Sequence, residues 1–159
     1  MMKQICVLMV GIFGLCACAS KNAVVPKGSI NIADLDLKFK SVQIDLTSDK
    51  YKGDIDKYWQ PVKKTIPSHP MSEETSRLSG CVEFLFVVDE KAKNIKISQA
   101  YPEGAFDHVA TQTLKEWRWT PTRKNEQKLP ALLKIQMDFV SDISENKLEA
   151  QQHCGWQHP

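Results

Sequence analysis

Hydrophobic and polar positions alternate most regularly in the second half of the chain. Within residues 81–88, every second residue is large and apolar, and the intervening residues are also largely apolar. This pattern predicts a β-strand buried on both faces. The apolar set is Val82, Phe84, Phe86 and Val88. A charged turn at residues 89–94 and a second alternation at residues 95–100 predict that this strand is the first arm of a hairpin.

A helical period follows the hairpin. Apolar residues recur at positions i, i+3, i+4, i+7, i+8 and i+11: Phe106, Val109, Ala110, Thr113, Leu114 and Trp117. Residues 133–139 then alternate again, with a polar outer side, and predict a last strand. The order strand, strand, helix, strand predicts an α+β fold, in which one helix packs on one face of a small antiparallel sheet.

The first half of the chain is less regular and forms an N-terminal extension. Residues 35–40 and 42–46 alternate at period two, which predicts two short strands in a hairpin or an added sheet edge. Spacings of three and four between Tyr51 and Val62 predict a helix within residues 50–64, before Pro67. The tail from Ser141 is polar until Cys154-Gly155-Trp156, which a disulfide could hold against the rest of the domain.

Composition and charge narrow the function. The 159 residues carry 21 Lys+Arg against 19 Asp+Glu, a formal charge of +2, which leaves no basic excess for a nucleic-acid partner. No glycine-rich phosphate loop, HExxH or CxxC pattern occurs, and the four histidines are scattered. We therefore expect no cofactor, no metal and no enzymatic activity. One alternative is a metal site at His153, Cys154 and His158, although ligands on a loose tail would make a weak one.

The first residues have the pattern of an export signal. Lys3 precedes an apolar run at residues 5–15, which is too short for the roughly 30 Å of a bilayer core. Leu15-Cys16-Ala17-Cys18 resembles the bacterial lipoprotein box, and the resemblance implies cleavage after residue 17, lipidation of Cys18 and a membrane anchor. The following Ala19 favours the outer membrane. The alternative is ordinary cleavage near Ala17 or Ala19, which would release a soluble protein.

After removal of the signal and lipidation, two cysteines remain, Cys81 and Cys154. Two cysteines in an oxidising compartment predict one disulfide. Two unpaired buried thiols are the alternative. A catalytic thiol that pairs Cys81 with His108 is a weaker interpretation, because no motif surrounds either residue.

Four segments together resemble the C-terminal domain of TonB proteins: Ser79-Gly80-Cys81-Val82-Glu83-Phe84-Leu85-Phe86-Val87-Val88-Asp89, Ile95-Lys96-Ile97, Phe106-Asp107-His108-Val109-Ala110 and Trp117-Arg118-Trp119-Thr120-Pro121. The resemblance covers about residues 66–141. It divides the chain into a signal (1–17), a lipidated tether and extension (18–65), the TonB-like domain (66–141) and a tail held by the disulfide (142–159).

Within the matching motifs we expect mainly structural roles. Trp117 and Trp119 should anchor the core where the helix meets the sheet. Arg118 should be a solvated or capping cation, Gly80 should permit a tight entry into the strand, and Pro121 should block continuation of the helix.

The resemblance implies a function in which an extended segment of an outer-membrane transporter or another envelope protein is recruited as an extra strand. Strand addition needs an exposed sheet edge. The matching edge is the last strand: Leu133, Lys134, Ile135, Gln136, Met137, Asp138 and Phe139. The expected location is the envelope of a Gram-negative bacterium, facing the periplasm.

Departures from the family pattern keep other functions open. TonB proteins begin with an uncleaved membrane helix and a long proline-rich spacer, whereas this chain has a short signal and only Pro26 before Pro61. His69-Pro70 stands where the family usually has Tyr-Pro. The alternatives to a lipid-anchored binding module are an energy transducer of unusual build and a structural lipoprotein. In the structural lipoprotein the edge would be occupied by a second copy, in a homodimer, or by the strands near residues 37–46.

Overall fold

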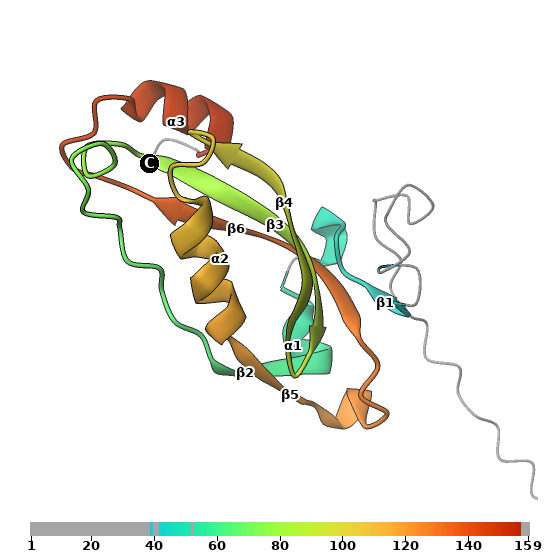
Figure 1. Cartoon of the computed structure of the whole chain (residues 1–159). Helices are drawn as coiled ribbons and strands as arrows, with labels where there is room; N and C mark the ends of the chain where they lie inside the picture. The colour runs from blue at the N-terminus through green and yellow to red at the C-terminus, as the bar shows by residue number, and fades with distance from the viewer. Residues whose placement is uncertain (1–38, 40–41, 52, 157–159) are drawn as a thin grey trace, which may run out of the picture.

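A computed structural model describes residues 39, 42–51 and 53–156, which form a mixed α+β structure around one sheet (Figure 1). Within this part of the chain the sheet has six strands in the order β1-β6-β3-β4-β5-β2. The strands are β1 (Ile44–Asp45), β2 (Trp59–Lys63), β3 (Gly80–Asp89), β4 (Lys91–Tyr101), β5 (Arg118–Pro121) and β6 (Ala131–Phe139). The helices are α1 (Ile55–Tyr58), α2 (Asp107–Glu116) and α3 (Lys147–Cys154), with 3-10 turns η3 (Asp49–Tyr51) and η4 (Arg123–Asn125).

β3 is the centre of the sheet and pairs antiparallel with β4 on one side and β6 on the other. Its alternate residues follow the predicted pattern, and eight of its ten positions are buried. A strand this fully buried has to be covered on both faces. The hairpin, helix and last strand appear in the predicted order, so the predicted α+β fold is confirmed.

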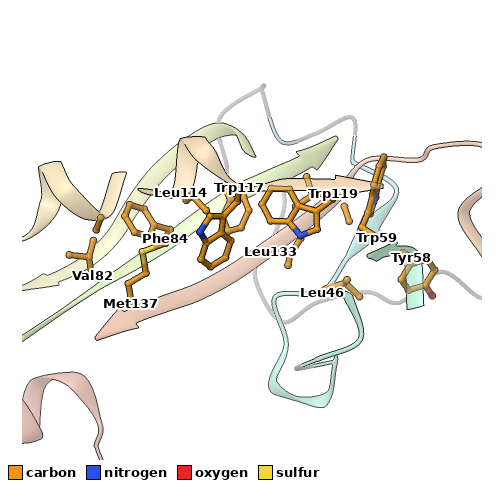
Figure 2. Close-up of a cluster of buried hydrophobic side chains, with 14 of the residues drawn as sticks. Leu46, Tyr58, Trp59, Val82, Phe84, Leu114, Trp117, Trp119, Leu133 and Met137 are labelled. Atoms are coloured by element: carbon orange, nitrogen blue, oxygen red, sulfur yellow. The ribbon is translucent and has the colours of Figure 1, made fainter. Parts of the chain in front are cut away.

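α2 packs on one face of the sheet and encloses the main core (Figure 2). Ala110 and Leu114 are fully buried there against Val82 and Phe84 of β3, and Met137 of β6 is buried beside them. Phe106, directly before α2, stacks on Phe139 with ring centroids 4.4 Å apart. Each large apolar side chain removed from water contributes about 1.5–3 kcal/mol, so this stripe fixes the position of the helix.

The opposite face of the sheet has two smaller covers. At one end, Phe39 and Val42 close over Leu85, Val87 and Leu132 in a separate apolar cluster. At the other end lies α3, joined to β3 by the disulfide between Cys81 and Cys154, the two cysteines that the sequence pairs. Because Cys81 and Val82 are neighbours on a strand, their side chains point to opposite faces, so α3 lies across the sheet from α2.

Three parts of the sequence-based assignment need correction. The helix predicted within residues 50–64 is wrong in its second half, where β2 pairs with β5. Pro61 cannot donate a helical hydrogen bond, and Trp59, fully buried with its Nε1–H 3.0 Å from the Leu129 carbonyl oxygen, is held by tertiary contacts instead. β5 had been interpreted only as the end of the helix, and α3 had not been expected.

The hairpin turn is also tighter than predicted. β3 ends at Asp89 and β4 begins at Lys91, with Glu90 in a left-handed conformation (φ 60°) between them. The charged residues expected in the turn therefore extend the strands. Of the two strands predicted in the extension, residues 42–46 contain β1, whereas residues 35–38 and 40 lie outside the described residues, as do Cys18 and the signal sequence.

Candidate functional site

β6 is the second strand of the sheet, because the short strand β1 lies on its outer side. β1 covers only the start of β6, where Ile44 pairs with Ala131 and Asp45 with Leu132 in a parallel arrangement. The Leu46 N–H donates to the Leu132 carbonyl oxygen at 2.9 Å, so the main-chain groups of Leu132 point toward this edge. β1 thus takes up the beginning of the edge and leaves the rest of it.

Beyond Leu132, β6 has no such partner strand within residues 39, 42–51 and 53–156. Backbone groups along a strand point to its two sides alternately, and the β6–β3 ladder runs without a bulge from Gly80 to Val88. Lys134, Gln136 and Asp138 therefore direct their N–H and C=O groups toward the same edge as Leu132. Among the described residues, no strand pairs with them on that side.

A groove of about 580 Å³ runs along this edge. Its floor is formed by β6 residues from both faces of the sheet: Leu133, Lys134, Ile135, Gln136 and Asp138. The predicted edge residues Met137 and Phe139 are instead buried in the main core. The groove therefore has the position, along unpaired main-chain groups, at which an additional strand could lie.

The wall on the α2 side combines apolar side chains with the polar Thr47, Ser48 and Asp49. It is built from the segment after β1, where buried Leu46 and the half-buried Tyr51 and Ile55 pack against the main core. Lys64 adds a cation to this side, with its Nζ 4.9 Å from the centre of the Trp117 ring. An extended segment in the groove would place every second side chain against this wall.

The wall on the α3 side combines polar and aromatic groups. Gln136 Nε2 donates to the Cys154 carbonyl oxygen at 3.0 Å, and Trp156 Nε1 donates to Asp138 Oδ1 at 2.8 Å. Further along, Lys134 Nζ lies 3.6 Å from Glu83 Oε2. Lys134 and Asp138 therefore already have polar partners, and the half-buried Trp156 ring is the main apolar surface of this wall.

The remaining predicted residues have structural surroundings. Trp117 and Trp119 are buried in the main core, and Trp117 Nε1 donates to the Thr65 carbonyl oxygen at 2.8 Å. Arg118 Nη1 donates to the Lys115 and Trp117 carbonyl oxygens, both at 2.7 Å, so it caps the end of α2.

Gly80 occupies a tight position, whereas Pro121 lies at the end of β5, five residues after α2 ends at Glu116, and so does not block continuation of that helix. A Cβ at Gly80 would collide with the Tyr101 carbonyl oxygen and lie 2.8 Å from the Phe106 ring, so glycine is needed for the close approach of β4 and α2. Pro121 ends β5 opposite Trp59.

The metal and catalytic-thiol alternatives can be compared with the structure of residues 39, 42–51 and 53–156. No group of three or more histidine, cysteine or acidic side chains there could hold a metal ion. The thiol that the catalytic and metal alternatives require is consumed in the disulfide. His108 is exposed on α2, and both ring nitrogens of His69 contact carbonyl oxygens, those of Pro70 and Leu78.

Two further properties of the described residues concern membrane spanning and a shifted pKa. In the described part of the chain, none of the helices has the length and apolar character required to cross a membrane. On the surface of α1, a hydrogen bond to Asp54 and its negative charge raise the pKa of Lys57, which lies outside the groove lining.

Comparison with known proteins finds one matching family model and a similar solved structure. Residues 66–140 match the family model of the Gram-negative bacterial TonB protein C-terminal region. This segment resembles TonB C-terminal domains. A solution NMR structure of the Pseudomonas aeruginosa TonB C-terminal domain shares the fold, with a TM-score of 0.50, 20% sequence identity, and coverage of 55% of this chain and 90% of that chain. No curated protein sequence matches the chain.

The TonB-like segment supplies the floor of the groove but not its walls. β3, β4, α2, β5 and β6 lie within residues 66–140, whereas the walls come from residues 46–49, 51, 53 and 55, Lys64 and residues 154–156. Sequence reasoning found the floor and missed Tyr51 and Trp156. A usable signal for Trp156 was present, since Cys154-Gly155-Trp156 combines a cysteine, a helix-ending glycine and an aromatic residue in an otherwise polar tail.

Proposed function

We propose that this protein is a TonB-like interaction module of the cell envelope that captures an extended segment of another envelope protein, or of a transporter, as an added strand on β6. The observation that carries the proposal is a row of main-chain groups at Lys134, Gln136 and Asp138 that no other described strand pairs with on the outer side of β6 and that faces a groove. Strand addition gains affinity from main-chain hydrogen bonds and specificity from alternate side chains. Both kinds of contact are offered along the same edge.

The anchor and location are part of the same proposal. The lipoprotein box at Leu15-Cys16-Ala17-Cys18 supports lipidation of Cys18, and the tether after it would let the domain reach partners near the membrane. A domain held in this way would bind without transmitting work itself. Replacement of Cys18 by alanine should abolish incorporation of a labelled fatty acid and release the protein from the membrane fraction.

Crosslinking in intact cells tests strand capture directly. A photo-reactive residue at Lys134, exposed at the groove floor, should crosslink a specific envelope protein through one short segment, which peptide mass spectrometry would identify. The matched control is the same residue at Lys96, which is exposed on β4 and does not line the groove. Lys96 should not give that adduct.

A proline variant separates main-chain pairing from ordinary surface contact. Gln136→Pro removes the outward N–H and also the side-chain hydrogen bond to the Cys154 carbonyl oxygen, so Gln136→Ala, which loses only the side-chain contact, is its matched control. The β6–β3 ladder keeps its own hydrogen bonds, because these come from the neighbouring residues. The Lys134 adduct should fall by at least about tenfold in Gln136→Pro relative to Gln136→Ala. An adduct that survives the proline, or that consists only of a second copy of this chain, would contradict the proposal.

A further inference from the structure

The groove has one wall that the TonB-like segment does not supply, and that wall is firmly anchored. α3 is tied to β3 by the disulfide between Cys81 and Cys154. At its other end, Asn146 accepts a hydrogen bond from the Ser79 N–H at 2.8 Å and donates one to the Ser79 carbonyl oxygen at 3.0 Å. The helix is therefore fixed to the sheet at both of its ends, at the place where β6 and β4 finish (Figure 1).

The residues after α3 are directed back to the edge of the sheet. Gly155 adopts a left-handed conformation (φ 65°) that ends the helix and turns the chain. The Trp156 main-chain N–H donates to the Gln151 carbonyl oxygen at 3.2 Å, and its indole N–H donates to Asp138 Oδ1 at 2.8 Å. The ring is thereby held at the groove with its polar atom already satisfied, so that what it offers a ligand is apolar surface.

Alternation along a bound strand decides which side chains would meet this ring. Every second side chain of a segment paired with β6 points to the α2 side, toward Leu46, Tyr51 and Ile55. The intervening side chains point to the α3 side, where Trp156 is the aromatic group lining the groove. Each wall of the groove would therefore contact one face of the bound segment.

We propose that Trp156, held in place by α3, is a partner-contacting residue that selects segments with an apolar side chain on the α3-facing side of the added strand. This inference rests on the proposed strand capture and adds to it a specificity determinant outside the TonB-like segment. The ligand is a single extended segment of about six residues, since the unpaired stretch of β6 from Leu133 to Asp138 would span about 20 Å.

The same walls argue for a single segment rather than a second copy of the sheet. The β6 strand of a second copy would bring its own α2 and α3 on the two faces of its sheet. Those layers would need the space that residues 46–49, 51, 53, 55 and 154–156 occupy beside β6. An isolated extended segment carries no such layers and fits between the walls.

Peptide selection on the purified full-length, oxidised protein tests the inference. Selection from random eight-residue peptides displayed on phage should enrich sequences that have apolar residues on both faces of the added strand. Trp156→Ala should weaken binding of an enriched synthetic peptide by about tenfold. Trp156→Phe, which keeps an aromatic face, should restore affinity to within about threefold of the wild-type value.

Two further variants complete the design. Leu148→Ala changes an exposed residue of α3 that does not line the groove, and it should leave affinity unchanged. Cys81→Ala combined with Cys154→Ala removes the staple and should weaken binding about as much as Trp156→Ala. Far-ultraviolet circular dichroism and the melting temperature of Trp156→Ala would confirm that the fold is retained.

The outcomes distinguish this inference from the proposed function. Peptides whose binding is lost in Gln136→Pro but unchanged in Trp156→Ala would overturn the role of Trp156 alone. Tighter binding by Trp156→Ala would also overturn it, because the residue would then obstruct the edge. Failure to select any peptide that depends on Gln136, or self-association through β6 in place of peptide binding, would contradict strand capture itself.

Discussion

The two faces of the sheet hold their helices by different means. On one face, α2 is positioned by apolar packing, with Phe106, Ala110 and Leu114 fully excluded from solvent. On the other face, α3 buries only Ala150 and Cys154. It is attached by the disulfide, by the hydrogen bonds of Asn146, by hydrogen bonds from the side chains of β4 and β6 to its last carbonyl oxygens, and by stacking of His153 on Tyr101. One helix belongs to the core of the domain, whereas the other is fastened to its surface.

This difference separates the framework of the domain from the part that adapts it. Apolar packing spreads the stabilisation over many contacts, so α2 should form whenever the sheet forms. A helix fastened by one covalent bond and a few polar contacts can be acquired or lost without rebuilding the core. α3 in this position supplies the Trp156 wall while leaving the TonB-like framework as it is.

The largest expected effect comes from breaking the apolar face. Phe106→Ala removes a fully buried ring that stacks on Phe139 and packs edge-on against His69, and it should lower the free energy of unfolding by about 4 kcal/mol. Urea denaturation at equilibrium measures the change. His108→Ala, an exposed site on the same helix, is the control and should stay within about 0.5 kcal/mol of wild type. A loss below about 1 kcal/mol at Phe106 would contradict the account of this face.

The second-largest effect is expected from removing the disulfide on the other face. Cys81→Ala combined with Cys154→Ala opens a loop whose ends are 73 residues apart in sequence and should cost about 3 kcal/mol. The loss should be uneven, with amide hydrogen exchange rising most in α3 while α2 keeps its protection. A dithiol should lower the stability of the wild type toward that of the variant and leave the variant unchanged. Equal loss of protection in both helices would show that the two faces are not independent.

The contrast between the faces also explains what the sequence revealed about the fold. α2, β3 and β6 were predictable because their burial repeats at the period of the element, as in the stripe from Phe106 to Trp117. β2 was misassigned because the spacing of its apolar residues also fits a helix, and pairing with β5 decides between the two. α3 buries too few side chains to leave a period, so its position is set by partners distant in sequence.

The candidate groove was predictable to a similar extent. Its floor follows from the alternation in residues 133–139. Part of the outer side of β6 is covered by β1, as the alternative in which residues near 37–46 occupy the edge expects, and beyond Leu132 no described strand pairs there. The walls could not be derived, because Tyr51 and Trp156 reach the edge through turns whose direction depends on tertiary contacts. The predicted disulfide limited where the tail could lie, but the orientation of Trp156 depends on its hydrogen bond to Asp138.

A smaller effect tests the polar fastening of α3. Asn146→Ala leaves the fully buried Ser79 without partners for its main-chain N–H and C=O, and it should cost about 2 kcal/mol in thermal or urea unfolding. Asn146→Asp keeps an acceptor for the N–H but loses the donor to the carbonyl oxygen, so it should remain destabilised. Because the disulfide persists in both variants, α3 should stay attached. Loss of hydrogen-exchange protection throughout α3 in Asn146→Ala would mean that the disulfide is not the main contact that holds the helix in place.

The smallest expected effect lies at the end of α2, where one polar contact assists the apolar face. Arg118 donates to two carbonyl oxygens at the last turn, and its positive charge lies at the negative end of the helix dipole. Arg118→Ala should therefore cost about 0.7 kcal/mol, with a smaller loss for Arg118→Lys, which keeps the charge but not the guanidinium geometry. High salt should reduce the difference between alanine and lysine, because part of the effect is electrostatic. A loss as large as that of Phe106→Ala would mean that α2, like α3, depends on individual polar contacts rather than on the packing of its apolar stripe.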